Sequence, residues 1–190
     1  TYLARIDLSA HGHFKVPGLE FDKTPGIEKG TPFAYHVFGT ALTEVTVDCL
    51  RGSAVVDAVR IVHDNGRSID TLIDRGQVFG GLMQGIGWMT MEKLSWAENG
   101  APLVDTASKY KVPDIKSVPP VLELHFLENA DNQYAVANSK AVGEPPFMYG
   151  IGAYFAIQEA LGAFRPGKAL PVEAPATPEY ILGCLYGLEK

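Results

Sequence analysis

The chain has 190 residues, 46% of them hydrophobic and 20% charged, with a formal net charge of −6. This size supports one globular domain with a core of its own, or two small lobes. The acidic balance and the absence of a Lys/Arg cluster argue against nucleic acid or an anionic membrane as a partner, and no apolar run reaches the roughly 18 residues that span a bilayer. The two cysteines, Cys49 and Cys184, lie far apart in apolar surroundings, which favours free thiols of a cytoplasmic protein over a disulfide framework.

The N-terminal part of the chain predicts β-structure. Residues 1–32 are rich in glycine, proline and other turn formers, which indicates short strands and loops. β-Branched residues then alternate with polar ones within residues 33–50, and this period of two predicts a strand. Residues 54–63 follow a turn at Arg51 and Gly52, and we expect them to pair with that strand as a hairpin.

A glycine-rich helix is expected next. We place its start at Asp74, because Asp74 and Gln77 have the spacing of a capping box, and its end near Trp96. Its apolar stripe consists of Val78, Leu82, Met83, Ile86 and Met89. Five glycines between Gly76 and Gly87 destabilise this helix, at roughly 0.8–1 kcal/mol each relative to alanine. Something is therefore expected to approach the backbone closely, whether a strand, another helix or a ligand.

Residues 121–127 predict a further strand, because their polarity alternates. The residues expected on its inner face are Leu122, Leu124 and Phe126. Downstream, Pro145 and Pro146 can begin a helix, since proline fits the first helical turn, and we expect this helix to end near Phe164. The stripe expected on this helix consists of Ile151, Tyr154, Phe155, Gln158 and Leu161.

Together these elements predict an α+β fold, in which helices pack on a mixed sheet. We expect a main unit over residues 1–165. Residues 166–190 are expected to form a Pro-rich tail that ends in a short helix, at about residues 179–188.

Most candidate sites receive little support from the sequence. His11 and His13 could bind a metal, but closed metal sites usually need three or four ligands, and no carboxylate or cysteine lies directly beside them in the sequence. The glycine-rich helix lacks both the Gly-x-Gly-x-x-Gly turn of a dinucleotide site and the Gly-Lys-Ser/Thr of a P-loop. Ser139 and Cys49 have no evident partner for nucleophilic catalysis.

Glu144 is the best single candidate because of its setting. It lies between Gly143 and two consecutive prolines, in the stretch SKAVGEPPF at residues 139–147. A rigid turn of this kind can fix a carboxylate for chemistry. The alternative is structural, since an acid at the positive end of a helix stabilises the helix start.

Several motifs occur together and in order. They are IDRGQVFGGLMQGIGWMTMEKLSW at residues 73–96, KYKVPDIKSVPPV at residues 109–121 and SKAVGEPP at residues 139–146. With the stretch FAYHVFGTALTEVTVDCLRG at residues 33–52, they resemble the C-terminal part of the molybdenum-binding subunit of the xanthine dehydrogenase/aldehyde oxidase family, the molybdenum hydroxylases. The resemblance covers most of residues 10–165 and implies a domain of the type that binds the molybdenum cofactor.

The resemblance implies roles for three residues. The acid of the family's Gly-Glu-Pro-Pro motif is its general base, which is Glu144 in this chain. The glutamine of the Gly-Gln-x-x-Gly-Gly motif donates a hydrogen bond to an oxygen ligand of molybdenum, and that residue is Gln77. Gly143 would bring backbone close to the metal, and no residue of this chain is implied as a direct metal ligand. We therefore expect Gln77 and Glu144 to lie within the span of a small cofactor.

The chain departs from the family pattern at two places. Phe79 stands where the family often has an acid, and Asp70 and Thr71 stand where it often has Asn-Pro. Both departures favour an altered pocket or an atypical member of the family. Neither one touches Glu144 or Gln77.

The activity implied by the resemblance is hydroxylation of an electron-poor carbon in a purine-like heterocycle or an aldehyde, with water as the oxygen source and Glu144 taking a proton. The implied cofactor is molybdenum held by molybdopterin. Iron–sulfur clusters and FAD would lie on other segments or subunits, because two cysteines cannot hold a pair of clusters that need about four each. The expected partners are those segments, the rest of the molybdenum subunit and a small-molecule substrate. The alternative is a structural domain that folds but stays inactive and cofactor-free without the rest of the subunit.

Overall fold

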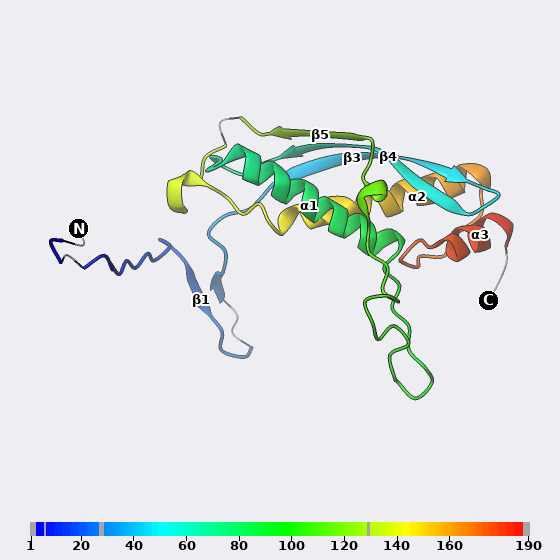
Figure 1. The fold of residues 1–190 in the computed structure, drawn as a ribbon, viewed down its shortest axis with the longest axis horizontal. Helices are drawn as coiled ribbons and strands as arrows, with labels where there is room; N and C mark the ends of the chain where they lie inside the picture. Colours follow the sequence, from blue (N-terminus) through cyan, green and yellow to red (C-terminus); the bar gives the residue numbers. More distant parts are fainter. Residues whose placement is uncertain (1–2, 6, 27–28, 129, 188–190) are drawn as a thin grey trace.

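The computed structural model describes residues 3–5, 7–26, 29–128 and 130–187. Its strands are β1 (Glu20–Asp22), β2 (Lys29–Thr31), β3 (Gly39–Asp48), β4 (Ser53–His63) and β5 (Val121–Phe126). Its helices are α1 (Thr71–Thr90), α2 (Ile151–Phe164) and α3 (Pro178–Tyr186), with 3₁₀ segments η1 (Ile115–Ser117), η2 (Val136–Asn138) and η3 (Pro145–Gly150). Figure 1 shows β3, β4 and β5 as one sheet lying over α1 and α2, with the β1–β2 hairpin set apart from it.

β4 is the central strand of the sheet, between β3 and β5. It pairs antiparallel with β3, so that His63 at its end lies opposite Gly39, and parallel with β5, where His63 lies opposite Phe126. The expected hairpin and the mixed sheet of an α+β fold are therefore confirmed. The first long strand begins at Gly39, so residues 33–38 lie outside it, contrary to the sequence prediction.

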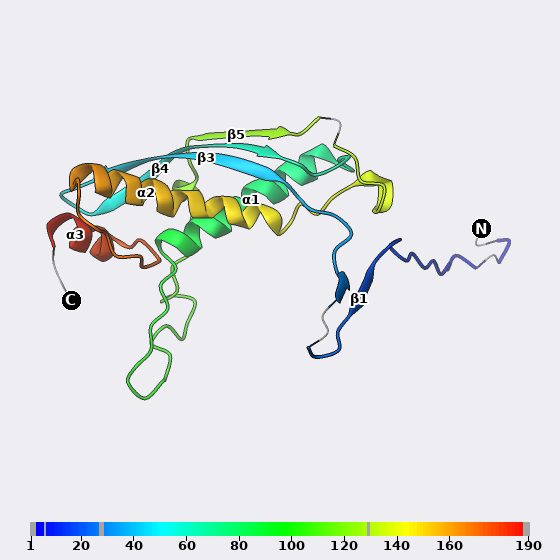
Figure 2. The same ribbon diagram turned by 180° about the vertical axis from the view of Figure 1, so that it is seen from behind.

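Both long helices cover the same face of the sheet, as the two opposite views show (Figures 1 and 2). One core cluster joins the sheet to α1 and consists of Val56, Val59, Ile61, Val78, Leu82, Ile86, Leu124 and Ala153. A second core cluster joins α2 to α3 and consists of Met89, Tyr154, Ile157, Leu161, Ala176, Tyr180, Ile181, Cys184 and Leu185. The apolar stripe predicted for α1 is thus confirmed. The stripe predicted for α2 is wrong at Phe155, which is 65% exposed, because Ile157 takes the buried position instead.

α1 begins earlier than the sequence predicts. Asp70 is its N-cap, and its carboxylate accepts hydrogen bonds from the first-turn N–H groups of Leu72 (3.0 Å) and Ile73 (3.1 Å). The capping box expected at Asp74 and Gln77 is therefore wrong. The Asp74 carboxylate instead accepts hydrogen bonds from side chains of the loop that precedes the helix.

The other helix ends also differ from the prediction. α1 ends at Thr90 rather than near Trp96. The segment that begins with the double proline is first a 3₁₀ helix, η3, and becomes α-helical only at Ile151. α3 ends at Tyr186, and the expected end at Leu188 lies outside the described residues.

Glycines allow α1 to pack directly against the backbone of η3. A Cβ built on Gly85 would overlap the carbonyl oxygen of Phe147 and lie 3.0 Å from the Cα of Gly150. A Cβ on Gly81 would lie 3.2 Å from the backbone nitrogen of Phe147. The expected close approach of another element to this helix is confirmed at these two positions.

A pair of glycine substitutions tests this packing. Gly85→Ala should lower the free energy of unfolding by about 1–3 kcal/mol, because the added methyl group forces two backbones apart. Among the described residues no atom lies within 4 Å of the Gly80 Cβ position, so Gly80→Ala on the same helix should raise the free energy of unfolding by about 0.5–1 kcal/mol. Urea unfolding of both variants measures the difference, and equal effects of the two substitutions would contradict the packing argument.

Candidate functional site

Glu144 lies where the loop of residues 139–143 enters η3. It is the N-cap residue of η3 by position, but its side chain makes no capping hydrogen bond. Its carbonyl oxygen accepts a hydrogen bond from the N–H of Phe147 (3.0 Å). The carboxylate is exposed and has no hydrogen bond or ion pair within the described part of the chain. The geometry therefore gives Glu144 no capping hydrogen bond, while its place at the start of η3 leaves the interaction of its charge with the helix start as the structural alternative.

Gln77 and Gly143 lie against each other, although they are far apart in the sequence. A Cβ built on Gly143 would lie 3.4 Å from the amide oxygen Oε1 of Gln77. The side chain of Gln77 is exposed and has no hydrogen-bond partner among residues that the structure describes. The structure thus brings Gln77 to Gly143, the residue directly before Glu144. The polar ends of the Gln77 and Glu144 side chains have no partner among the described residues.

The backbone around these residues is open. Gly76 and Gly80 lie one helical turn apart on α1, and a Cβ at either would meet no atom of another described segment within 4 Å. At Gly143 the neighbour that a Cβ would meet is the Gln77 amide alone. These small residues leave room for a bound group to reach the backbone beside the Gln77 amide, which fits a cofactor with oxygen ligands.

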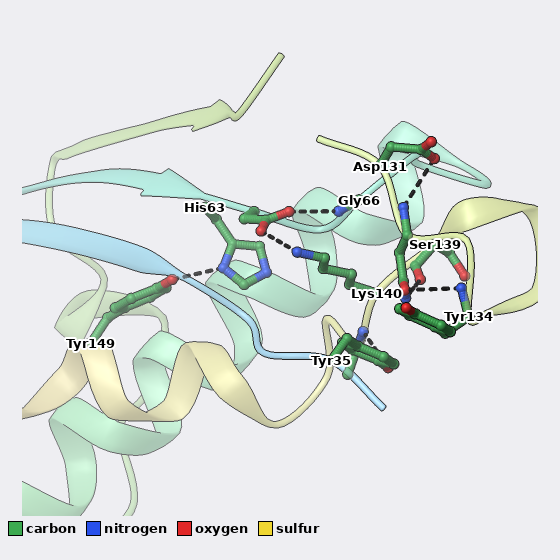
Figure 3. A network of polar contacts seen from close by, with 11 residues as sticks. Tyr35, His63, Gly66, Asp131, Tyr134, Ser139, Lys140 and Tyr149 are labelled. Atoms are coloured by element: carbon green, nitrogen blue, oxygen red, sulfur yellow. Dashed lines mark hydrogen bonds and ion pairs between the residues drawn. The ribbon is translucent and has the colours of Figure 1, made fainter. Parts of the chain in front are cut away.

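The loop that precedes Glu144 is anchored to the end of β4 by a buried ion pair. The ammonium Nζ of Lys140 lies 2.5 Å from Oδ2 of Asp64, and their side chains are only 10% and 6% exposed. The backbone N–H of Lys140 also donates to the carbonyl oxygen of Asn65 (2.8 Å). Figure 3 shows Lys140 and Ser139 lying beside Gly66 in this network.

A second polar contact anchors η3 to the same strand end. The hydroxyl of Tyr149 lies 2.7 Å from Nδ1 of His63, whose side chain is fully buried (Figure 3). Gly39 makes room for it, because a Cβ there would overlap the Tyr149 hydroxyl. Burial lowers the pKa of His63 below its usual value, against the opposing charges of Asp64 and Asp74. Burial, and then the charge of Asp64, raises the pKa of the Tyr149 hydroxyl.

The sequence did not single out His63, Asp64, Lys140 or Tyr149. His63 has no informative spacing to other histidines or acids, and a buried ion pair between distant segments leaves no periodic signal. The available signal was local: Asp64 opens an Asp-Asn-Gly turn, and Lys140 lies within the motif that contains Glu144. Neither feature indicates that the two residues meet.

The remaining residues considered for metal binding gain no support from the structure. His11 and His13 lie exposed in the N-terminal segment. Within residues 3–5, 7–26, 29–128 and 130–187, no group of three or more His, Cys, Asp or Glu side chains is arranged to hold a metal ion. The two cysteines are free, Cys184 buried and Cys49 partly buried. Among the helices in these residues, none has the length and apolarity needed to cross a membrane.

Comparison with known proteins identifies the domain. The sequence profile of the molybdopterin cofactor-binding domain matches residues 1–119. Over its whole length the chain is 39% identical to a xanthine dehydrogenase of Oryza sativa subsp. japonica, and over 95% of its length it is 41% identical to xanthine dehydrogenase 2 of Arabidopsis thaliana. The chain belongs to the molybdenum hydroxylase family. The match covers 14% of the length of each of these relatives.

Solved structures share the fold of this molybdenum hydroxylase domain. An aldehyde oxidoreductase from Desulfovibrio desulfuricans matches 82% of the chain with a TM-score of 0.67 and 29% identity, over 16% of its own length. A Cu,Mo-CO dehydrogenase matches 84% of the chain with a TM-score of 0.70, over 21% of its own length, and at 20% identity this likeness concerns the fold alone. The chain is a molybdenum-cofactor-binding domain of the xanthine dehydrogenase/aldehyde oxidase type.

The lowered pKa of His63 predicts a specific pH dependence of stability. Below the usual histidine pKa of about 6.5 the unfolded chain takes up a proton that the folded chain resists, so the free energy of unfolding falls as the pH falls through this range. His63→Gln should show a smaller fall between about pH 7.5 and about pH 5.5.

Urea unfolding at both pH values measures the effect. His125→Gln, on the exposed face of β5, is the matched control and should keep the wild-type fall. The same fall in His63→Gln as in the wild type would contradict the prediction.

Proposed function

We propose that this domain supplies the general base Glu144 to a molybdenum hydroxylase that hydroxylates an electron-poor carbon of a purine-like heterocycle or an aldehyde, using water. The observation that supports the proposal is the contact of Gln77 with Gly143, the residue directly before Glu144. The amide of Gln77 and the carboxylate of Glu144 both lack a partner in the described part of the chain. The xanthine dehydrogenases and aldehyde oxidoreductase that the domain resembles support this reaction class.

Each of the three residues has a distinct task in this proposal. The molybdenum cofactor, when bound, supplies the oxidising power for the hydroxylation. Glu144 accepts a proton as the oxygen nucleophile attacks the substrate carbon. Pro145 restricts the backbone of Glu144, from which the carboxylate projects. The Gln77 amide donates a hydrogen bond to an oxygen of the cofactor. Gly143 has no side chain, so the cofactor can approach its backbone.

The remainder of the enzyme is also part of the proposal. The domain covers only 14% of the length of its relatives, and the surface around Gly76 and Gly80 is open. We propose that other segments of the molybdenum subunit cover this surface and complete the substrate pocket. Iron–sulfur and FAD segments would carry the electrons away, because the two free cysteines here are too few for a cluster. In this view the isolated chain is a folded but inactive domain.

The first test concerns the isolated chain. The purified 190-residue chain should fold as an α+β domain, because its two apolar clusters connect the sheet to all three helices. It should contain no molybdenum, since the contacts proposed for the cofactor consist of one side-chain amide and glycine backbone. Circular dichroism and metal analysis measure these properties, and stoichiometric molybdenum in the isolated chain would contradict the proposal.

The second test concerns Glu144 in the complete enzyme. Glu144→Gln keeps the size of the side chain but removes the base, so the hydroxylation rate constant should fall by about 10²–10⁴-fold. The free energy of unfolding should change by less than about 1 kcal/mol, because the side chain forms no cap.

Turnover per bound molybdenum and urea unfolding measure the two effects separately. Glu159→Gln, at an exposed position on α2, is the matched control and should retain wild-type turnover. Near-normal turnover in Glu144→Gln would refute the assignment of the base.

A further inference from the structure

We propose that His63 and Asp64, consecutive residues at the end of β4, form a clamp that positions Glu144 by holding the backbone on both of its sides. The His63–Asp64 clamp binds Lys140, four residues before Glu144, and Tyr149, five residues after it. This inference rests on the proposed role of Glu144 as the base. Neither His63 nor Asp64 touches the reacting atoms, so both are positioning residues.

The first half of the clamp is the ion pair between Asp64 and Lys140. Both side chains are nine-tenths or more buried, so each charge depends on the other for compensation. Oδ1 of Asp64 is also occupied, because it accepts a hydrogen bond from the N–H of Gly66 (3.0 Å). The carboxylate is therefore held by its own turn and cannot follow Lys140 if the loop moves. The ring of Phe38 covers the ammonium group, with its centroid 5.8 Å from Nζ.

Backbone contacts extend this half of the clamp along the loop. Besides the bond from Lys140 to Asn65, the N–H of Arg67 donates to the carbonyl oxygen of Asn138 (2.9 Å). The N–H of Ala141 donates to the hydroxyl of Tyr35 (3.2 Å; Figure 3). The chain is thus fixed at several residues up to the point where it turns toward Gly143.

The second half of the clamp is the contact between His63 and Tyr149. The histidine is fully buried, and its Nε2 atom has no hydrogen-bond partner within the part of the chain that the structure describes. Burying a nitrogen without a hydrogen-bond partner is unfavourable. Among the described residues, the ring makes its one hydrogen bond through Nδ1, to the hydroxyl of Tyr149. That contact fixes η3 relative to β4, because Tyr149 belongs to η3 and Gly39 opens the space for its hydroxyl.

Between the two halves, Glu144 has no side-chain contact in the described part of the chain that would orient it. Its direction therefore depends on the backbone that the clamp holds, together with the packing of Pro146 and Phe147 on α1. A catalytic group that is displaced by about 1 Å can lose about 100-fold in rate. The clamp would thus act on the reaction rate through Glu144, without touching substrate or cofactor.

The test uses the complete enzyme and the double variant Asp64→Asn/Lys140→Met. This variant removes both buried charges together and leaves no lone charge in the core, while the introduced asparagine amide could still accept the hydrogen bond from Gly66. The rate constant for single-turnover hydroxylation per bound molybdenum should fall by about 10–100-fold. Lys109→Met removes an exposed ion pair with Asp105 by the same substitution and should leave the rate unchanged.

Two further measurements distinguish positioning from a general structural role. In a Glu144→Gln background the double variant should cause no further loss of rate, because the group that it positions is already gone. Amide hydrogen exchange at residues 139–144 should be faster in the double variant than in the wild type. If the double variant fails to bind molybdenum, Tyr149→Phe, which removes one hydroxyl only, takes its place and should show the same loss and the same dependence on Glu144.

The outcomes distinguish failure of the clamp from failure of the assigned base. A wild-type rate in the clamp variants, or an equal further loss in the Glu144→Gln background, would overturn the clamp. Near-normal turnover of Glu144→Gln by itself would instead refute the role of the base on which the clamp rests. Loss of rate that requires Glu144, together with faster exchange of the loop, supports the inference.

Discussion

The candidate site depends on the direct packing of α1 against η3. Gly81 and Gly85 carry no side chain, so the backbone of the segment around Phe147 can lie against the helix. This approach places Gln77, one turn before Gly81 on α1, beside Gly143 on the opposing segment. The glycines that weaken the helix as an isolated element are thus needed for the tertiary arrangement, because a larger residue would separate the two halves of the site.

Apolar packing brings the segments together, but polar contacts determine their orientation. The two core clusters connect the sheet to the helices through aliphatic and aromatic side chains, whose contacts are largely non-directional. The ion pair of Asp64 with Lys140 and the contact of His63 with Tyr149 are directional, and they lie on either side of Glu144. Buried polar groups of this kind favour one arrangement because any other leaves them without partners.

The open surface beside Gly76 and Gly80 is consistent with a domain that forms part of a larger enzyme. Two glycines on one helical face expose backbone that no described residue covers. Gln77 follows Gly76 on this helix, and Glu144 follows Gly143, which lies against the Gln77 amide. Neither the Gln77 amide nor the Glu144 carboxylate has a partner in the described part of the chain. The proposed function would give these features a common explanation, with the cofactor and the remaining segments of the subunit on the open side.

The sequence by itself determined the α+β class, the β3–β4 hairpin, the apolar faces of α1 and β5, and the motif that singles out Glu144. These features follow from local periodicity and from residue types at fixed spacing, which report which side of an element is buried. The capping box at Asp74 was wrong because its carboxylate is engaged by the preceding loop, and Phe155 was misplaced because periodicity in a strongly apolar helix does not tell which face meets the core. Only the tertiary structure decided that Gln77 meets Gly143 and that His63 and Asp64 hold the segment around Glu144, since contacts between distant residues arise from packing and leave no repeat in the sequence.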